Sequence, residues 1–205
     1  MRCVRKCCPV IVLLLLCLIN AILPGQSPAA TGESPLTVPI PGEFKPTLKS
    51  DGTPLYSSIA DIQSTFRQFS PDMEKFVYNK LLSDVPLIVP DSQWMKDLLA
   101  TYTSFITAER IRAEADTWDC ENFSSMLSSI TTVSVWRAGH FDTRAAVGWI
   151  KVNGKHGWAG IPSGTHALMF AVTGSGIFVI EPQNGRYIQL ADYPNCHDIK
   201  EVYLF

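Results

Sequence analysis

The chain of 205 residues is 46% hydrophobic and 18% charged, which suits one globular domain with a single core. It carries 17 basic and 19 acidic residues, and its first thirty residues hold three of the basic and none of the acidic ones. The remainder therefore has 14 basic against 19 acidic residues, a net charge of −5. That balance, without a cluster of basic and aromatic residues, argues against a nucleic-acid partner.

The first thirty residues have the pattern of an export signal. Arg2, Arg5 and Lys6 precede an apolar run from Val10 to Ile19, and small residues follow Pro24. The run is shorter than the roughly 20 apolar residues that span a bilayer. We therefore expect a cleaved signal peptide, with an uncleaved N-terminal anchor as the alternative. Both make the protein secreted, periplasmic or cell-surface, and only the anchor would give contact with a membrane.

Residues 31–56 are expected to form a separate spacer. This stretch combines Gly, Ser and Thr with five prolines, a composition that favours an extended, semi-rigid segment: Pro35, Pro39, Pro41, Pro46 and Pro54. The folded domain is then predicted to cover residues 57–205.

Hydrophobic spacing and capping residues predict four helices in the first half of this domain, beginning near residues 58, 71, 92 and 120. The second start, Ser70-Pro71-Asp72, combines a capping residue with a proline at the first helical position. The fourth helix is expected over residues 120–130, with Thr117 or Asp119 as its cap.

After residue 131 the apolar pattern changes to alternation with period two, which predicts strands over residues 144–152, 165–173, 177–182, 186–190 and 200–205. Asn153-Gly154 and Gly174-Ser175-Gly176 are expected to form turns between them. Helices followed by an antiparallel sheet predict an α+β fold.

Two cysteines remain once the leader is removed, Cys120 and Cys196. In an oxidising compartment a lone pair of cysteines indicates a disulfide. Cys120, however, is predicted to start a helix, where unpaired N–H groups and the helix dipole favour a thiolate. Cysteine counting alone leaves a structural disulfide and a reactive thiol equally open.

His166 is the histidine that needs an explanation, because it opens the apolar strand over residues 167–172, whereas His140, His156 and His197 lie in polar stretches. If Gly174-Ser175 is a two-residue turn, the residue numbers of each pair of partners across the hairpin add up to 349. His166 then shares a face with Glu181 and Gln183, and Glu181 is within reach. A three-residue turn would put Glu181 on the opposite face.

With the even register these residues form a thiol triad: Cys120 attacks, His166 transfers the proton and Glu181 orients the imidazole. The backbone N–H of Cys120 would meet an oxyanion. A second donor would come from a side-chain amide, for which the candidates are Gln183, Asn122 and Gln93.

Three segments carry a resemblance to known families: Asp119-Cys120-Glu121-Asn122-Phe123, His166-Ala167-Leu168 and Ile180-Glu181-Pro182-Gln183-Asn184-Gly185. Together they resemble bacterial and phage homologues of the mushroom agglutinin C-terminal domain, which is a papain-like cysteine protease. They are more distantly similar to bacterial transglutaminase-like cysteine proteinases. The resemblance covers about residues 90–190. It implies a papain-like or transglutaminase-like core, Cys120, His166 and Glu181 as catalytic residues, and a protein or peptide substrate. The agglutinin's sugar-binding β-trefoil is absent, so lectin activity does not carry over.

The resemblance also leaves calcium open, although the chemistry itself needs no cofactor. Asp116, Asp119 and Glu121 are the candidate ligands, but their spacing matches no known calcium loop.

The resulting expectation is an exported cysteine peptidase-like hydrolase that cleaves an amide bond through a thioester. Acyl transfer and cell-wall amide cleavage use the same triad and stay open. The alternative from another class is a secreted binding module on an inactive protease scaffold, with Cys120 and Cys196 joined in a disulfide.

Overall fold

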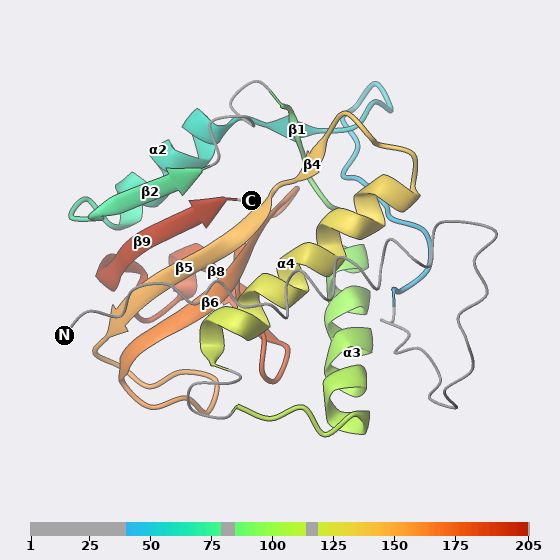
Figure 1. Ribbon diagram of the computed structural model, residues 1–205. Coiled ribbons are helices and arrows are strands. Elements are labelled where there is room, and N and C mark those ends of the chain that lie inside the picture. The colour runs from blue at the N-terminus through green and yellow to red at the C-terminus, as the bar shows by residue number, and fades with distance from the viewer. Residues whose placement is uncertain (1–39, 79–84, 114–118, 205) are drawn as a thin grey trace. The chain divides into compact units, whose positions relative to one another are not determined.

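The computed structural model describes residues 40–78, 85–113 and 119–204 (Figure 1). The chain divides into two compact units, residues 1–37 and 38–205, and the first of these lies outside the described residues. The expected leader and the start of the expected spacer therefore lie outside them as well. Among the helices in the described ranges, none has the length and apolar character needed to cross a membrane.

The second unit consists of helices followed by strands, with short strands before and between the helices. In chain order the elements are β1 (Tyr56–Ser57), α2 (Ile59–Phe69), β2 (Lys75–Tyr78), β3 (Leu87–Ile88), α3 (Ser92–Ala108), α4 (Cys120–Arg137), β4 (Arg144–Ala145), β5 (Val147–Gly154), β6 (Gly164–Thr173), β7 (Gly176–Glu181), β8 (Arg186–Gln189) and β9 (Ile199–Leu204). Two short 3₁₀ turns, Leu190–Asp192 and Cys196–Asp198, lie between β8 and β9. The fold is therefore α+β.

A six-stranded sheet, in the order β2-β9-β5-β6-β7-β8, forms the centre of this unit, and a small sheet β1-β3-β4 lies beside it. Helices α3 and α4 cover one face of the large sheet and α2 lies on the other (Figure 1). Along β6, Met169 and Ala171 pack with α3 and α4, while Leu168 and Phe170 pack with α2. Because both faces are buried, β6 is a continuous apolar run.

The predicted starts of the first, third and fourth helices are confirmed. Ser58 caps α2 in a capping box with Asp61, and Asp91 caps α3. Asp119 caps α4, which runs seven residues beyond the predicted end at 130 and finishes at Arg137. These starts depend on local hydrogen bonds between a cap side chain and nearby N–H groups, which a sequence pattern reports well.

The predicted second helix is wrong, because Lys75–Tyr78 forms the edge strand β2. Ser70 caps no new helix. Its backbone N–H bonds to Phe66 at the end of α2, while its hydroxyl donates to the carbonyl of Cys196 and accepts from the N–H of Ile199. These contacts, more than 120 residues away in sequence, direct the chain alongside β9.

The predicted antiparallel pairing is confirmed for β5 to β9, but the sheet as a whole is mixed, since the additional strand β2 pairs with β9 in parallel. Asn153-Gly154 does not form a turn, because both residues continue β5 and pair with Thr165 and Gly164. The turn at Gly174-Ser175 is confirmed: Thr173 pairs with Gly176, and Met169 pairs with Ile180, in the register that sums to 349.

The expected spacer is part of the folded unit from residue 40 onward. Phe44 is 4% exposed and packs edge-on against Trp94 with ring centroids 4.9 Å apart. The backbone N–H of Thr47 donates to the carbonyl of Val89 at 2.8 Å. Prolines in this stretch do not make a free linker, because their neighbours supply apolar and backbone contacts to the domain.

Replacing Ser70 by alanine is expected to lower the free energy of unfolding by about 1–3 kcal/mol, because it leaves the buried N–H of Ile199 without its acceptor. Urea unfolding measures this change. Ser129→Ala, at an exposed position whose hydroxyl bonds only within α4, is the matched control, and we expect it to change stability by less than about 0.5 kcal/mol. Equal effects of the two variants would contradict the bridging role of Ser70.

Candidate functional site

Cys120 is the first residue of α4, and its thiol is free. The Asp119 carboxylate caps the helix by accepting from the N–H groups of Glu121 and Asn122. Cys120 is half-buried, whereas Cys196 is buried and also free. The disulfide considered between them is therefore wrong, and the thiol of Cys120 is available at the helix start.

His166 and Ala167, near the start of β6, meet this thiol. The backbone N–H of Ala167 donates to Cys120 Sγ at 3.3 Å, and the His166 ring shares a hydrogen bond with the same thiol. The side chain of His166 is 12% exposed. His156 and His197, which the sequence placed in polar turns, are exposed.

Glu181, at the end of β7, completes the group. Its Oε2 lies 2.5 Å from His166 Nε2. Its Oε1 accepts from the backbone N–H of Gln183 at 3.0 Å, and its side chain is 0% exposed. The sequence-predicted thiol, imidazole and carboxylate therefore lie together in the order Cys120, His166, Glu181.

The pKa of His166 is raised from its usual 6.5 to about 9. Burial of the ring is the largest single influence and acts in the opposite direction, toward a lower pKa. Hydrogen bonds to Cys120 and Glu181, together with the attraction of their charges, outweigh it. The ring is therefore protonated at neutral pH, between two groups that can be negative.

This arrangement can polarise a ligand and can share one proton with it. A positive charge beside a thiol favours the thiolate, which is the nucleophilic form. The Glu181 carboxylate fixes the orientation of the ring and the proton on Nε2. The backbone N–H groups at the start of α4 add partial positive charge on the same side as the thiol.

The predicted support residues fare differently. The backbone N–H of Gln183 holds Glu181, a role that the side-chain pattern did not indicate. Asn122 lies in the first turn of α4, two residues from the thiol. Gln93 is not brought to the site: it lies at the start of α3, and its amide donates to Asp97.

The candidate calcium ligands do not form a recognisable site in the described residues. Asp116 lies outside them, and within them no three His, Cys, Asp or Glu side chains are grouped as metal ligands. Asp119 is engaged as the cap of α4, and Glu121 lies 4.0 Å from Lys151 Nζ. Calcium binding stays a prediction.

Two loops flank the His166–Glu181 pair, and sequence reasoning missed the contact between them. Asn184, in the turn after Glu181, donates from Nδ2 to the carbonyl of Ala159 at 2.7 Å. Ala159 has φ of 55°, unusual for a non-glycine residue, and lies in the loop that leads into β6. An Asn-Gly pair after a strand indicates a turn, but its distant partner leaves no local pattern.

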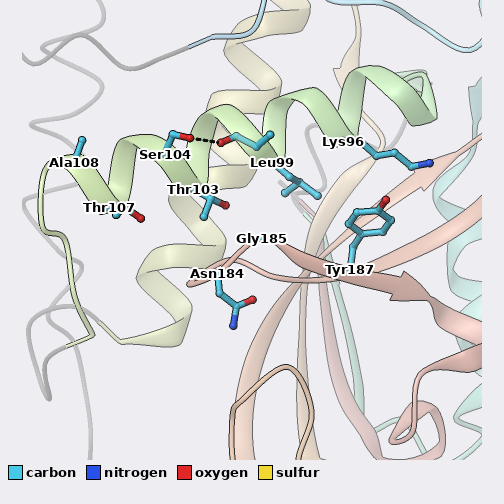
Figure 2. Close-up of a pocket in the computed structure, with 10 residues that line it drawn as sticks. Lys96, Leu99, Thr103, Ser104, Thr107, Ala108, Asn184, Gly185 and Tyr187 are labelled. Carbon is cyan, nitrogen blue, oxygen red and sulfur yellow. Dashed lines mark hydrogen bonds between the residues drawn. The ribbon is translucent and has the colours of Figure 1, made fainter.

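A groove of about 670 Å³ lies on the α3 side of the same turn (Figure 2). Figure 2 shows side chains from one side of α3 facing Gly185 and Tyr187. Its polar and aromatic lining comprises Lys96, Thr103, Ser104, Thr107, Asn184 and Tyr187. Tyr187 is 41% exposed, and Lys96 Nζ lies 5.8 Å from its ring centroid.

No family model and no curated protein matches this chain. Several solved structures match its fold, including the following two. The first is a complex of PSL1a, a lectin of Polyporus squamosus, with E64. The two sequences are 16% identical, and the match covers 73% of this chain and 50% of the lectin chain with a TM-score of 0.50. The second is Polyporus squamosus lectin bound to the human-type influenza-binding epitope Neu5Acα2-6Galβ1-4GlcNAc, with 15% identity, the same coverages and a TM-score of 0.51.

These comparisons show a fold of the mushroom agglutinin type, and the chain spans half the length of each lectin chain. They contradict the prediction of a cysteine peptidase-like enzyme, because both of these solved structures are of a lectin. The predicted protein or peptide substrate has no support from them either.

The raised pKa of His166 predicts a pH-dependent stability. Below pH 6.5 the ring is protonated in both the folded and the unfolded protein, and its contribution to the free energy of unfolding is fully present. That contribution is lost as the pH rises toward 9. The difference of about 2.5 pH units corresponds to roughly 3 kcal/mol. Urea unfolding of the wild type and of His166→Gln, which can still donate to Glu181 but does not titrate, measures it between pH 6 and 10. A stability difference between the two that is constant with pH would contradict the assignment.

Proposed function

We propose that this chain is an exported binding module on a papain-like scaffold, and that its ligand is held at Cys120, His166 and Glu181. One observation carries the proposal: a fully buried carboxylate bonds at 2.5 Å to an imidazole that in turn meets a free thiol at a helix start. The export signal expected in residues 1–30 supports the location outside the cytoplasm.

The site is costly to maintain, which supports a functional role. A buried charge must be matched by a partner and by hydrogen bonds, and Glu181 uses both the His166 ring and the Gln183 N–H. An apolar pair of similar volume would fill the space without that requirement. A raised pKa at a buried imidazole beside a carboxylate, as at His166, is typical of functional sites.

The thiol gives the binding a definite chemistry. An electrophilic carbon of the ligand, such as the epoxide carbon of E64, forms a bond with Cys120 Sγ while its C–O bond opens. The proton held by His166 passes to the released oxygen. The product is one ligand covalently retained per chain, and the reaction stops there.

A second candidate, carbohydrate binding, is favoured by the groove beside α3. Thr103, Ser104 and Thr107 line it with an exposed Tyr187, and Lys96 supplies a positive charge for an acidic sugar (Figure 2). One of the solved lectins was bound to a sialylated trisaccharide. An exposed aromatic ring with a charged side chain beside it is typical of a small-ligand site.

Wild-type protein treated with E64 in the absence of reductant is expected to gain the mass of one E64, retained under denaturing conditions. Cys120→Ala is expected to gain none, and Cys196→Ala, which removes the buried thiol, is expected to behave like the wild type. Intact-mass spectrometry measures all three. Labelling of the wild type that survives in Cys120→Ala would contradict the proposed site.

Carbohydrate binding predicts that Neu5Acα2-6Galβ1-4GlcNAc, the epitope named for one solved lectin, shifts the NMR signals of Thr103, Tyr187 and their neighbours. Lys96→Ala is expected to weaken the affinity about tenfold through loss of an ionic hydrogen bond. Lys155→Ala, a charge change at an exposed residue outside the groove, is the control. Equal affinity of Lys96→Ala and the wild type would contradict an acidic-sugar site in the groove.

A further inference from the structure

We propose that Lys151 determines which ligands the Cys120 thiol retains, by binding an anionic group such as a carboxylate next to the carbon that the thiol attacks. This role builds on the proposed function of the thiol site, and it makes the preferred ligand an acidic electrophile. Lys151 acts on the choice of ligand, while the reacting atom is still Cys120 Sγ.

Two independent contacts place Lys151 beside the thiol. Lys151 pairs with Ala167 across β5 and β6, so the two side chains lie on the same face of the sheet. The backbone N–H of Ala167 donates to Cys120 Sγ at 3.3 Å. Lys151 Nζ also lies 4.0 Å from Oε1 of Glu121, the residue that follows Cys120. The ammonium group is therefore held near the thiol both by the sheet register and by the start of α4.

The charge of Lys151 is only weakly matched. Among the described acids, only Glu121 lies within 4.0 Å of Lys151 Nζ, a distance too long for a hydrogen bond. The side chains of Lys151 and Glu121 are 36% and 48% exposed, so solvent screens their attraction. A ligand carboxylate that forms a short, charge-assisted hydrogen bond to the ammonium group can therefore take the place of Glu121.

The acid opposite Lys151 on β9 already has other partners. Glu201 pairs with Lys151 in the β5–β9 register. Its Oε1 accepts from Lys75 Nζ at 3.3 Å, and its Oε2 accepts from the Tyr203 hydroxyl. Because these two groups match the charge of Glu201, the Lys151 ammonium group stays available to a ligand.

The other acid at the start of α4 is also engaged. The carboxylate of Asp119 accepts from the backbone N–H groups of Glu121 and Asn122. Its charge is thus directed at the helix that it caps, and Glu121 is the acid that competes with a ligand for Lys151.

The sheet beside Lys151 gives a ligand an aromatic floor. Trp149 lies two residues before Lys151 and so on the same face of β5. It is 8% exposed and stacks on Tyr203, with ring centroids 3.9 Å apart. An apolar surface keeps water from one side of an ion pair and so strengthens it. A ligand with an acidic group beside its reactive carbon can therefore bond to the thiol and to Lys151 at once.

The test compares two reagents that share a reactive carbon and differ in charge, iodoacetate and the neutral iodoacetamide. With either, Cys120 Sγ forms a bond to the CH₂ carbon and iodide leaves. Both reagents use the same thiolate, so the ratio of their rates at one pH does not depend on the amount of thiolate. Lys151→Met is expected to lower the iodoacetate rate relative to the iodoacetamide rate about fivefold, the effect of one partly exposed ion pair. Mass spectrometry of the Cys120 peptide measures both rates.

Matched variants identify the charge as the cause. Lys151→Arg keeps the charge and should keep the wild-type ratio. Lys75→Met removes the same charge from the same face two strands away and should keep it too. Glu121→Gln removes the competing carboxylate and should raise the ratio. In 1 M NaCl, where the screening length is about 3 Å, the difference between Lys151→Met and the wild type should disappear.

Different results would overturn the role of Lys151 and the proposed function. No reaction of Cys120 with either reagent in the folded wild type would overturn the proposed thiol site itself. Reaction with both reagents, at a rate ratio that is the same in Lys151→Met and in the wild type, would overturn the role of Lys151 alone. A lowered ratio that persists in 1 M NaCl would do so as well, because it would not be electrostatic. Circular dichroism checks that each variant is folded.

Discussion

The carboxylate of Glu181 lies at the end of β7 with no exposed surface, and the geometry of the site follows from the need to match its charge. One oxygen takes the N–H of Gln183 and the other takes the ring of His166. Because a buried negative charge is stable only with such partners, the ring stays protonated and fixed in direction. The Cys120 thiol at the start of α4 then faces a positive charge that the rest of the domain keeps in place.

Much of this site was predictable because its signals are local. The capping residue Asp119 predicts the start of α4 and therefore places Cys120 at the first position of the helix. The two-residue turn at Gly174-Ser175 sets the register of β6 and β7, which placed His166 and Glu181 within reach of each other even though the ladder ends before them. Caps and tight turns depend on residues a few positions apart, so a single sequence reports them.

Contacts between distant segments were not predictable. Ser70 looks like a helix cap, yet its hydroxyl bridges Cys196 and Ile199 and leads the chain into a strand. The Asn184–Ala159 bond likewise has no local signature. The class of function was not predictable from the sequence for a different reason. A thiol, imidazole and carboxylate in register specify how a proton is shared, but whether a ligand is turned over or retained depends on the surrounding surfaces.

The position of β9 between β2 and β5 has a consequence for how the domain forms. Lys75 in β2 pairs with Glu201, a separation of 126 residues, so the edge strand has no partner until residues 199–204 have been made. Sheets that close through such distant pairings fold slowly, because the loop must be ordered before the contacts form. Until residues 199–204 are made, β2 and β5 therefore lack the strand that lies between them, whereas β6 and β7, which carry His166 and Glu181, already have each other as partners.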